Sequence, residues 1–314
     1  MDHRAYPKIS SRPNTAQASP GGVWVATEKV HGAQVVLGCD GHQTRVGKRK
    51  AWLADDEAFF GWQLLRAELE RAARDVHAAL GGPRVVRIYG EVFGGAYPHP
   101  QVLATPGVSA VQTGIWYSPN LHFSVFDLLV EDAAGDAGEF LSHTEVEKLA
   151  SAHGLLVVPL VGRGPRALVD ELPTRAPTRV PAWFRLPAID GNVAEGLVLK
   201  PDVRAAPEDR IIIKRKIPEF DDARFDEAVP FRSTASLAVS DLAVHAARLV
   251  NAARIASARS KVGLAKADIA SEIVLDVLVD LEAAFPTAFA ALTSEDEDKL
   301  RAEVAALAAA IVGG

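Results

Sequence analysis

The amino-acid pattern changes character near Pro230, and this change limits the possible folds more than any other feature of the chain. From Val23 to about Lys216, short runs of β-type residues are separated by Gly and Pro. Such a pattern is typical of an α+β domain built on largely antiparallel sheets. Beyond Pro230, Ala, Leu and Val recur with helical spacing. We therefore predict a main domain of residues 1–228 and a small all-α C-terminal domain of residues 229–314.

The expected elements follow from hydrophobic periodicity and from the residues that begin and end helices. The expected strands are rich in β-branched and aromatic residues and are Val23–Val30, Gln34–Gly38, Arg84–Val92, His122–Val130, Leu155–Val161, Ala194–Lys200 and Arg210–Lys216. The expected helices are Asp55–Leu80, Thr144–His153 with Thr144 as its cap, Ser236–Lys261, Asp268–Phe285 and Ser294–Val312. Residues 95–120 and 163–190 are expected to form long functional loops.

Composition excludes several classes of protein. The 314-residue chain has no uncharged apolar stretch of the roughly 20 residues that a membrane span requires, and it begins without the apolar core of a signal peptide. Cys39 is the single cysteine, which rules out an internal disulfide framework and suits a reducing compartment. We therefore expect a cytoplasmic protein that is not bound to a membrane.

The charge is unevenly distributed. The formal net charge of −6 argues against a protein that coats polyanions in general. Residues 226–314 carry 8 Lys and Arg against 13 Asp and Glu, which leaves residues 1–225 at only −1. A site for nucleic acid must therefore be a local basic groove.

The first motif with chemical potential is Thr27-Glu28-Lys29-Val30-His31-Gly32. A strand end would hold the amine of Lys29 rigidly, and the glycine turn would let the backbone approach a ligand closely. This combination suits a lysine nucleophile that attacks a phosphate. A solvated surface lysine before a turn is the alternative.

The second motif combines Glu195 and Lys200, which bracket an apolar strand, with Lys214 and Lys216 on the following strand. Alternation along that strand puts Lys214 and Lys216 on one face. Two cations on one face can offset the charge that develops when a phosphoryl bond breaks. An exposed charged strand face is the alternative.

Two further segments would suit a nucleotide. The strand before Gly94 delivers Glu91 into a glycine-bounded turn, where a carboxylate can accept hydrogen bonds from ribose hydroxyls. Phe126 offers an aromatic face on which a base could stack, although a phenylalanine in a β-run is more often a core residue.

Taken in order, these segments resemble the covalent nucleotidyltransferase superfamily, whose catalytic domain has an ATP-grasp-like α+β fold. Within it, the likeness is to ATP-dependent RNA ligases of the RNA ligase 2 type. The matching motifs are Lys29-Val30-His31-Gly32, Lys48-Arg49 with Asp56-Glu57-Ala58-Phe59-Phe60-Gly61, Tyr89-Gly90-Glu91-Val92-Phe93-Gly94, Phe126-Asp127, Glu195-Gly196-Leu197-Val198 and Lys214-Arg215-Lys216. Gln34 departs from the Asn that is common in this group, and no second β-rich module follows Lys216.

The resemblance implies that Lys29 forms a lysyl-AMP with ATP, that AMP passes to an RNA 5′-phosphate, and that a 3′-hydroxyl then displaces it. It also implies a divalent cation, Mg²⁺ or Mn²⁺, which Glu195 would help to hold through water. The catalytic set would be Lys29, Glu195, Lys214 and Lys216. The nucleotide-binding set would be Glu28, Lys29, Val30, Arg49, Glu91, Phe126, Lys214 and Lys216, with Arg49 and Glu91 on the ribose, Phe126 on adenine and Glu28 assisting base recognition.

The expected partners are RNA ends, at nicks in duplex RNA or in an RNA–DNA hybrid, handled by a monomeric RNA-repair enzyme. The candidate RNA contacts are His31, Gln34, Arg248 and Arg259, with a second basic set of Arg163, Arg166, Arg175 and Arg179. On one continuous helix Arg248 and Arg259 would lie about 20° apart around the helix axis, with His245 beside them, and this edge could contact RNA phosphates. An equal alternative is that these side chains form a solvated face of the helical domain with no RNA contact. The competing functions are a DNA ligase or capping-type nucleotidyltransferase, and a non-catalytic nucleic-acid or nucleotide-binding protein.

Overall fold

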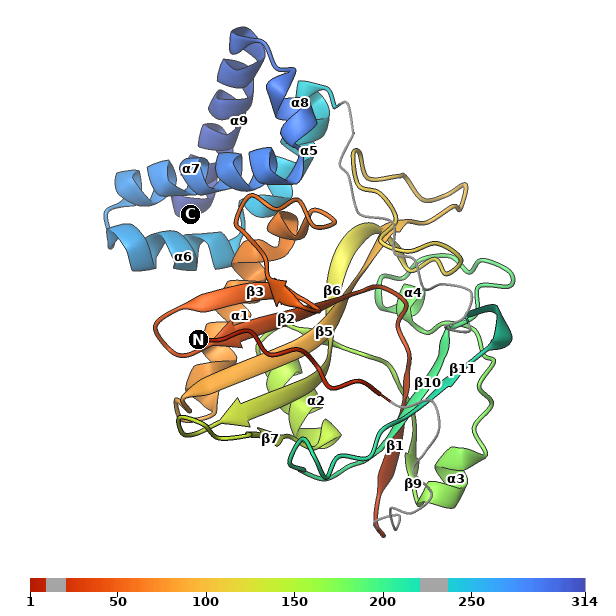
Figure 1. The fold of residues 1–314 in the computed structure, drawn as a ribbon. Helices are drawn as coiled ribbons and strands as arrows, with labels where there is room; N and C mark the ends of the chain where they lie inside the picture. The colour runs from red at the N-terminus through yellow and green to blue at the C-terminus, as the bar shows by residue number, and fades with distance from the viewer. Residues whose placement is uncertain (10–20, 221–236, 314) are drawn as a thin grey trace. The chain divides into compact units, whose positions relative to one another are not determined.

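The computed structural model describes residues 1–9, 21–220 and 237–313 (Figure 1). Contacts divide the chain into two compact units. The first comprises the described residues of Met1–Trp52, Ala72–Leu103 and Ala110–Val229, and the second those of Leu53–Arg71, Ala104–Ser109 and Pro230–Gly314. The α+β class, the antiparallel sheets and the C-terminal helices are confirmed. The predicted domain boundary at residues 228–229 lies outside the described residues and stays a prediction.

The smaller sheet of the first unit carries the ends of the lysine-rich motifs. Its strands are β1 (Trp24–Glu28), β9 (Leu160–Gly164), β10 (Gly196–Pro201) and β11 (Ile213–Lys216), in the order β11-β10-β1-β9. All of its pairs are antiparallel. Every residue of β1 is buried, and Trp24, Leu197 and Leu199 belong to one apolar cluster. The central position of β1 therefore fixes where the chain leaves the sheet at Lys29.

The larger sheet carries the remaining motifs. Its strands are β2 (Ala33–Cys39), β3 (Thr44–Lys48), β4 (Ala51–Trp52), β5 (Val85–Ala96), β6 (Ser118–Glu131) and β7 (Glu139–Phe140), in the order β4-β3-β2-β5-β6-β7. β8 (Leu156–Val157) pairs in parallel with β6. The short strands β3, β4 and β7 were not predicted, because runs of two to five residues carry little periodic signal.

One turn joins the two sheets. The chain leaves β1 at Lys29, whose N–H donates to the Gly196 carbonyl at 2.9 Å, and enters β2 at Ala33. A Cβ atom on Gly32 would lie 2.3 Å from the Val92 carbonyl oxygen, so only glycine permits this approach. The turn therefore holds Lys29 where the sheets meet.

Two predicted helix starts are wrong. The helix expected from Asp55 begins only with the 3-10 turn η1 (Trp62–Leu65) and α1 (Arg66–Ala79), because Phe60 and Gly61 have left-handed φ values of 54° and 72°. The expected cap Thr144 lies inside α2 (His143–Ala152). Ser142 caps that helix, since it forms a reciprocal capping box with Glu145.

Three short helical pieces complete the first unit. They are α3 (Arg166–Asp170), α4 (Val180–Trp183) and η2 (Pro218–Phe220). The region expected to be one long loop over residues 163–190 therefore contains α3 and α4. The loop prediction was too coarse because neither helix is longer than five residues.

The second unit contains the C-terminal helices. They are α5 (Val239–Leu249), α6 (Ala252–Val262), α7 (Lys266–Ala284), α8 (Pro286–Ala290) and α9 (Ser294–Gly313). Their shared core includes Leu242, Ile273, Val277, Leu281 and Val304. None of the described helices combines the length and apolar character that crossing a membrane would take.

The single helix predicted over residues 236–261 is wrong, and its start at Ser236 lies outside the described residues. Asn251 has φ −138° and ψ 177°, and its side chain accepts the Arg254 N–H as the cap of a new helix. Arg248 and Arg259 therefore lie on different helices. His245 is buried, with Nε2 2.6 Å from the Pro106 carbonyl oxygen. The expected common edge is not formed, and a role of either arginine in RNA binding stays a prediction.

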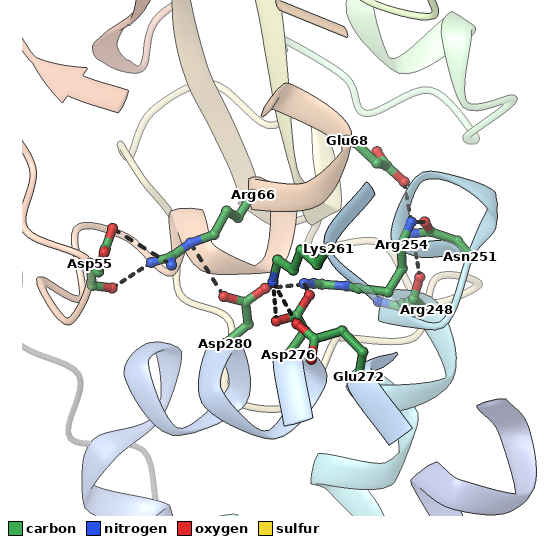
Figure 2. A network of polar contacts seen from close by, with 10 residues as sticks. All are labelled: Asp55, Arg66, Glu68, Arg248, Asn251, Arg254, Lys261, Glu272, Asp276 and Asp280. Atoms are coloured by element: carbon green, nitrogen blue, oxygen red, sulfur yellow. Dashed lines mark hydrogen bonds and ion pairs between the residues drawn. The ribbon is translucent and has the colours of Figure 1, made fainter. Parts of the chain in front are cut away.

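A buried ionic network lies inside the second unit (Figure 2). The Arg254 guanidinium lies 2.5 Å from the Asp280 carboxylate, and both side chains are at most 4% exposed. Arg66 Nε lies 3.3 Å from the same carboxylate. At the network's outer side, Lys261 pairs with Asp276 at 2.6 Å and with Glu272 at 3.0 Å. The network thus ties the start of α1 to α6 and α7.

Asp280→Ala is expected to lower the free energy of unfolding by about 3 to 5 kcal/mol, because it leaves Arg254 charged and buried without its closest partner. Asp268→Ala, at an exposed position of the same helix, should change it by less than about 0.5 kcal/mol. Urea unfolding followed by helical circular dichroism measures both. Equal effects of the two substitutions would contradict a stabilising role for the network.

Candidate active site

Two lysine amines meet at one carboxylate. Lys29 Nζ lies 2.8 Å from Glu195 Oε2, and Lys216 Nζ lies 2.8 Å from Glu195 Oε1. His31 Nδ1 lies 3.3 Å from Glu195 Oε2. Lys29 follows β1, Glu195 precedes β10, and Lys216 ends β11. In the β10–β11 register Lys216 lies opposite Gly196, the residue after Glu195, so the pairing of the strands brings these side chains together.

The Glu195 carboxylate is almost completely buried and ionised. Its side chain is 2% exposed, whereas those of Lys29 and Lys216 are 23% and 19% exposed. Burial alone would raise the pKa of Glu195, but the hydrogen bond from His31 and the charge of Lys29 lower it to about 2. A permanent negative charge therefore holds both amines in place.

A pocket opens beside Lys29. It combines an apolar lining with a few polar groups, which is the usual composition of a small-molecule site. Its lining residues are Tyr6, Ile9, Thr27, Glu28, Lys29, Val30, Gln34, Glu91, Phe126, Asp127, Val158, Val198 and Lys200. Five of the residues predicted to bind the nucleotide line this pocket, and they are Glu28, Lys29, Val30, Glu91 and Phe126.

Three other predicted residues lie in or beside this site. Gln34, predicted to contact RNA, lines the pocket opposite Glu91 in the β2–β5 register. Arg49 is exposed in the turn after β3, and its charge acts on Glu91. Lys214 lies two residues before Lys216 on β11 and pairs with Val198 in register. Neither Arg49 nor Lys214 is among the described residues that line the pocket.

The carboxyl group of Glu91 lies in this pocket and has a raised pKa. Burial raises the pKa of its carboxyl group to about 8, with Lys29 opposing and Glu195 adding to the rise. Its Oε2 atom is buried and has no hydrogen-bond partner among the described residues. A hydroxyl group of a ligand in the pocket could satisfy this oxygen.

This pKa predicts a pH-dependent stability. Folded Glu91 keeps a proton up to about pH 8, whereas the unfolded chain releases it near pH 4.3. Ionisation therefore removes stability as the pH rises through this range. Glu91→Gln cannot ionise and is expected to melt about 5 °C above the wild type at pH 9, with a much smaller difference at pH 5. Calorimetry at both pH values measures this, and equal melting temperatures at pH 9 would contradict it.

Asp127 and Lys200, which both belong to segments singled out in the sequence, line the pocket together with Tyr6, to which the sequence assigned no role. The Tyr6 hydroxyl donates to Asp127 Oδ2 at 2.6 Å and accepts from Arg210 at 2.8 Å. Lys200 Nζ donates to Asp127 Oδ1 at 2.6 Å. Burial would raise the pKa of Asp127, but Arg210 and Lys200 lower it to about 2. No local signal could link Tyr6 to Asp127, since 121 residues separate them.

Glu28 has an observed role besides the predicted one. Its carboxylate accepts hydrogen bonds from the Thr178 hydroxyl at 2.5 Å and from the Arg179 N–H at 2.8 Å. Burial raises its pKa, and these two hydrogen bonds oppose the rise. Glu28 therefore ties the segment around α4 to the residue that precedes Lys29.

The donor set suits a divalent cation held partly by a substrate. The described residues contain no group of three His, Cys, Asp or Glu side chains that could hold a metal ion. Mg²⁺ commonly binds through one or two carboxylates, waters and substrate phosphates. Glu195, whose two oxygens already face Lys29 and Lys216, fits such a role through water and not as a member of a closed protein cage.

Comparisons with known proteins show what this chain is similar to. The family model described as RNA ligase matches residues 22–216. The mitochondrial RNA-editing ligase 2 of Trypanosoma brucei brucei is 35% identical over 200 residues, which are 56% of this chain and 48% of that protein. The solved structures include a mutant of a Naegleria gruberi RNA ligase with ATP and Mn, at 13% identity and a TM-score of 0.43, covering 63% of this chain and 50% of that chain. The same ligase with AMP and Mn gives 16% identity and a TM-score of 0.44, covering 65% and 52%.

The chain thus spans about half the length of the curated relative and of the solved structures that it matches. The matched residues 22–216 include Lys29, Glu91, Glu195 and Lys216, which the fold brings to the two-sheet junction. Because the family model covers more than half of the chain, this protein belongs to the RNA ligase family.

Proposed function

We propose that the protein is an ATP-dependent RNA ligase that joins 3′-hydroxyl and 5′-phosphate ends through a lysyl-AMP intermediate. One observation carries this proposal. Lys29 lines a pocket, and its amine lies beside a buried carboxylate that also holds a second lysine, within the segment that matches the RNA ligase family.

In the first step, Lys29 Nζ would attack the α-phosphorus of ATP. An N–P bond forms, the bond to the pyrophosphate oxygen breaks, and the amine loses a proton. Lys216, across the Glu195 carboxylate from Lys29, is suited to hold the phosphate oxygens as their charge redistributes. Lys214, on the same strand, is proposed to assist it.

The nucleoside would occupy the pocket beside Lys29. Phe126 lines the pocket and offers a ring for adenine, while Glu91 and Arg49 are proposed to bind the ribose. Because the pKa of Glu91 is raised, its carboxyl group in the protonated form could donate one hydrogen bond to a ribose oxygen as well as accept one. A divalent cation near Glu195, Mg²⁺ or Mn²⁺, would neutralise the charge of the departing pyrophosphate.

The later steps follow from the same site. The 5′-phosphate of an RNA end would attack the phosphorus of lysyl-AMP, which frees the amine and leaves AMP on the RNA. The 3′-hydroxyl of the adjoining end would then form the phosphodiester and release AMP. We propose nicks in duplex RNA or in RNA–DNA hybrids as substrates, and a cytoplasmic monomer that acts in RNA repair.

A matched panel of nicked duplexes tests the proposal. The protein with ATP and Mg²⁺ or Mn²⁺ is expected to seal an RNA nick and to release AMP and pyrophosphate. The panel should contain RNA, DNA and both hybrid nicks, each with ATP and with GTP. Preference for DNA nicks would indicate a DNA ligase, and transfer from GTP without sealing would indicate a capping-type enzyme. Binding without any nucleotide turnover would indicate a non-catalytic protein.

A further inference from the structure

Residues 178–187 form a segment that contains α4 (Figure 1). Hydrogen bonds attach this segment at both ends to the active-site framework. At its start, Thr178 and Arg179 donate to the carboxylate of Glu28, the residue before Lys29. At its end, the Tyr97 hydroxyl donates to the Pro187 carbonyl at 2.5 Å. The segment is therefore fixed relative to the lysine that the first reaction step uses.

Two aromatic rings lie on this segment. Trp183 and Phe184 are half-buried and pack against a cluster that contains Val30 and Ile217, the residues after Lys29 and Lys216. Phe184 stacks on His122 with ring centroids 4.0 Å apart and an interplanar angle of 21°. The rings are therefore packed against this cluster and partly exposed beside the active site.

The arginines of this region differ in whether their side chains form ion pairs or hydrogen bonds with other residues of the chain. Four of them have partners within the chain, namely Arg163 with Asp202, Arg166 with Asp170, Arg175 with Glu219, and Arg179 with the Leu160 carbonyl oxygen. Arg185 is exposed, and among the described residues it has no ion pair or side-chain hydrogen bond. The second basic set predicted from the sequence thus has partners within the chain, and its role in RNA binding stays a prediction, whereas Arg185, which was not in that set, has no such partner among the described residues.

The backbone of Arg185 is held in an uncommon conformation. Its φ of 53° lies in the left-handed region, which non-glycine residues rarely adopt. The Arg185 N–H donates to the Ala182 carbonyl, and the Leu186 N–H donates to the Pro181 carbonyl, each at 3.2 Å. Residues held in this way by their surroundings are concentrated at ligand-binding sites.

We propose that Trp183, Phe184 and Arg185 form an RNA-docking platform beside the active site. The guanidinium of Arg185 contacts a backbone phosphate, and the indole of Trp183 contacts a base of the RNA strand whose end approaches Lys29. Arginine binds phosphate through paired hydrogen bonds, and aromatic rings stack on bases of any sequence. The platform rests on the proposed function, because that function requires an RNA end near Lys29.

Arg185→Ala is expected to raise the KM for nicked RNA about tenfold, because one charge-assisted contact is lost. The slope of log affinity against log salt concentration should fall by about 1. The rate of adenylylation by ATP without RNA should stay within about twofold, since AMP transfer to Lys29 precedes RNA binding. A merely structural role would not produce this combination.

Three further variants sharpen the test. Trp183→Leu keeps an apolar side chain and should raise the RNA KM at least about fivefold without changing the salt slope. Arg185→Lys should restore most of the salt slope. Arg204→Ala removes an arginine that is 50% exposed but paired with Glu139 and Glu145, and it should change neither quantity. Melting temperatures verify that each variant folds.

The outcomes separate this proposal from the proposed function. A sealing-competent wild type with an unchanged RNA KM and salt slope in Arg185→Ala would overturn the platform alone. If the wild type forms no AMP adduct, the proposed ligase function is wrong. Fluorescence anisotropy can then still measure the affinity of the wild type and of Arg185→Ala for the same nicked RNA, and equal affinities would overturn the platform as well. A wild type that does not bind nicked RNA would overturn both.

Discussion

Lys29→Ala is expected to abolish the covalent protein–AMP adduct, a loss of more than about 10³-fold in adenylylation. The reason is that Lys29 lines the pocket, whereas Lys216 does not line it and is held on the other oxygen of Glu195. Labelled ATP with Mg²⁺ or Mn²⁺, followed by denaturing electrophoresis, measures the adduct. An adduct of normal yield in Lys29→Ala would remove this residue from the role of nucleophile.

A matched control and a bypass complete that experiment. Lys148→Ala removes an exposed lysine on α2 and should leave adduct formation unchanged. An RNA nick that already carries AMP on its 5′-phosphate does not need the first step. Lys29→Ala is therefore expected to seal this substrate while failing on an ordinary nick with ATP. Failure on both substrates would indicate that the substitution damages more than the nucleophile.

Glu195→Gln is expected to slow adenylylation about 100-fold. The substitution keeps the shape of the side chain but removes the buried negative charge that holds Lys29 and Lys216, each at 2.8 Å. Without that charge the two amines repel each other and lose their common anchor. Single-turnover kinetics with saturating ATP measure the rate of the first step.

The control for this variant is Glu208→Gln, which neutralises an exposed carboxylate. It should leave the rate of adenylylation unchanged. A normal rate in Glu195→Gln would show that the charge is not needed, and a loss in both variants would point to net charge and not to the site.

Much of the candidate site could be predicted from the sequence because its residues lie in strands or directly beside them, although Glu91 lies inside β5 and not in the turn that was expected. Each of the four main residues lies in or next to an apolar run with a clear period. Lys29 follows β1, Glu91 lies in β5, Glu195 precedes β10 and Lys216 ends β11, and the pairing of these strands brings the four residues together. The residues Tyr6 and Arg210 could not be predicted in the same way. Their contacts with Asp127 depend on the packing of distant segments.

The errors in the helices have local causes. Apolar spacing continued through Asn251, so the sequence suggested one helix, yet the Asn251 side chain accepts the Arg254 N–H and begins α6. The late start of α1 has a different cause, because Phe60 and Gly61 adopt left-handed conformations that end any earlier helical turn. Periodicity reports which face is apolar, whereas these backbone conformations decide where a helix is interrupted.

The central claim is that Lys29 carries AMP during the reaction. The most direct measurement is mass spectrometry of the protein after incubation with ATP and Mn²⁺, followed by proteolysis and sequencing of the modified peptide. We expect the mass of one AMP group on the peptide that contains Lys29, and its loss when nicked RNA is added. AMP on another residue, such as Lys216, or an unmodified protein under conditions that support ATP binding would contradict the account.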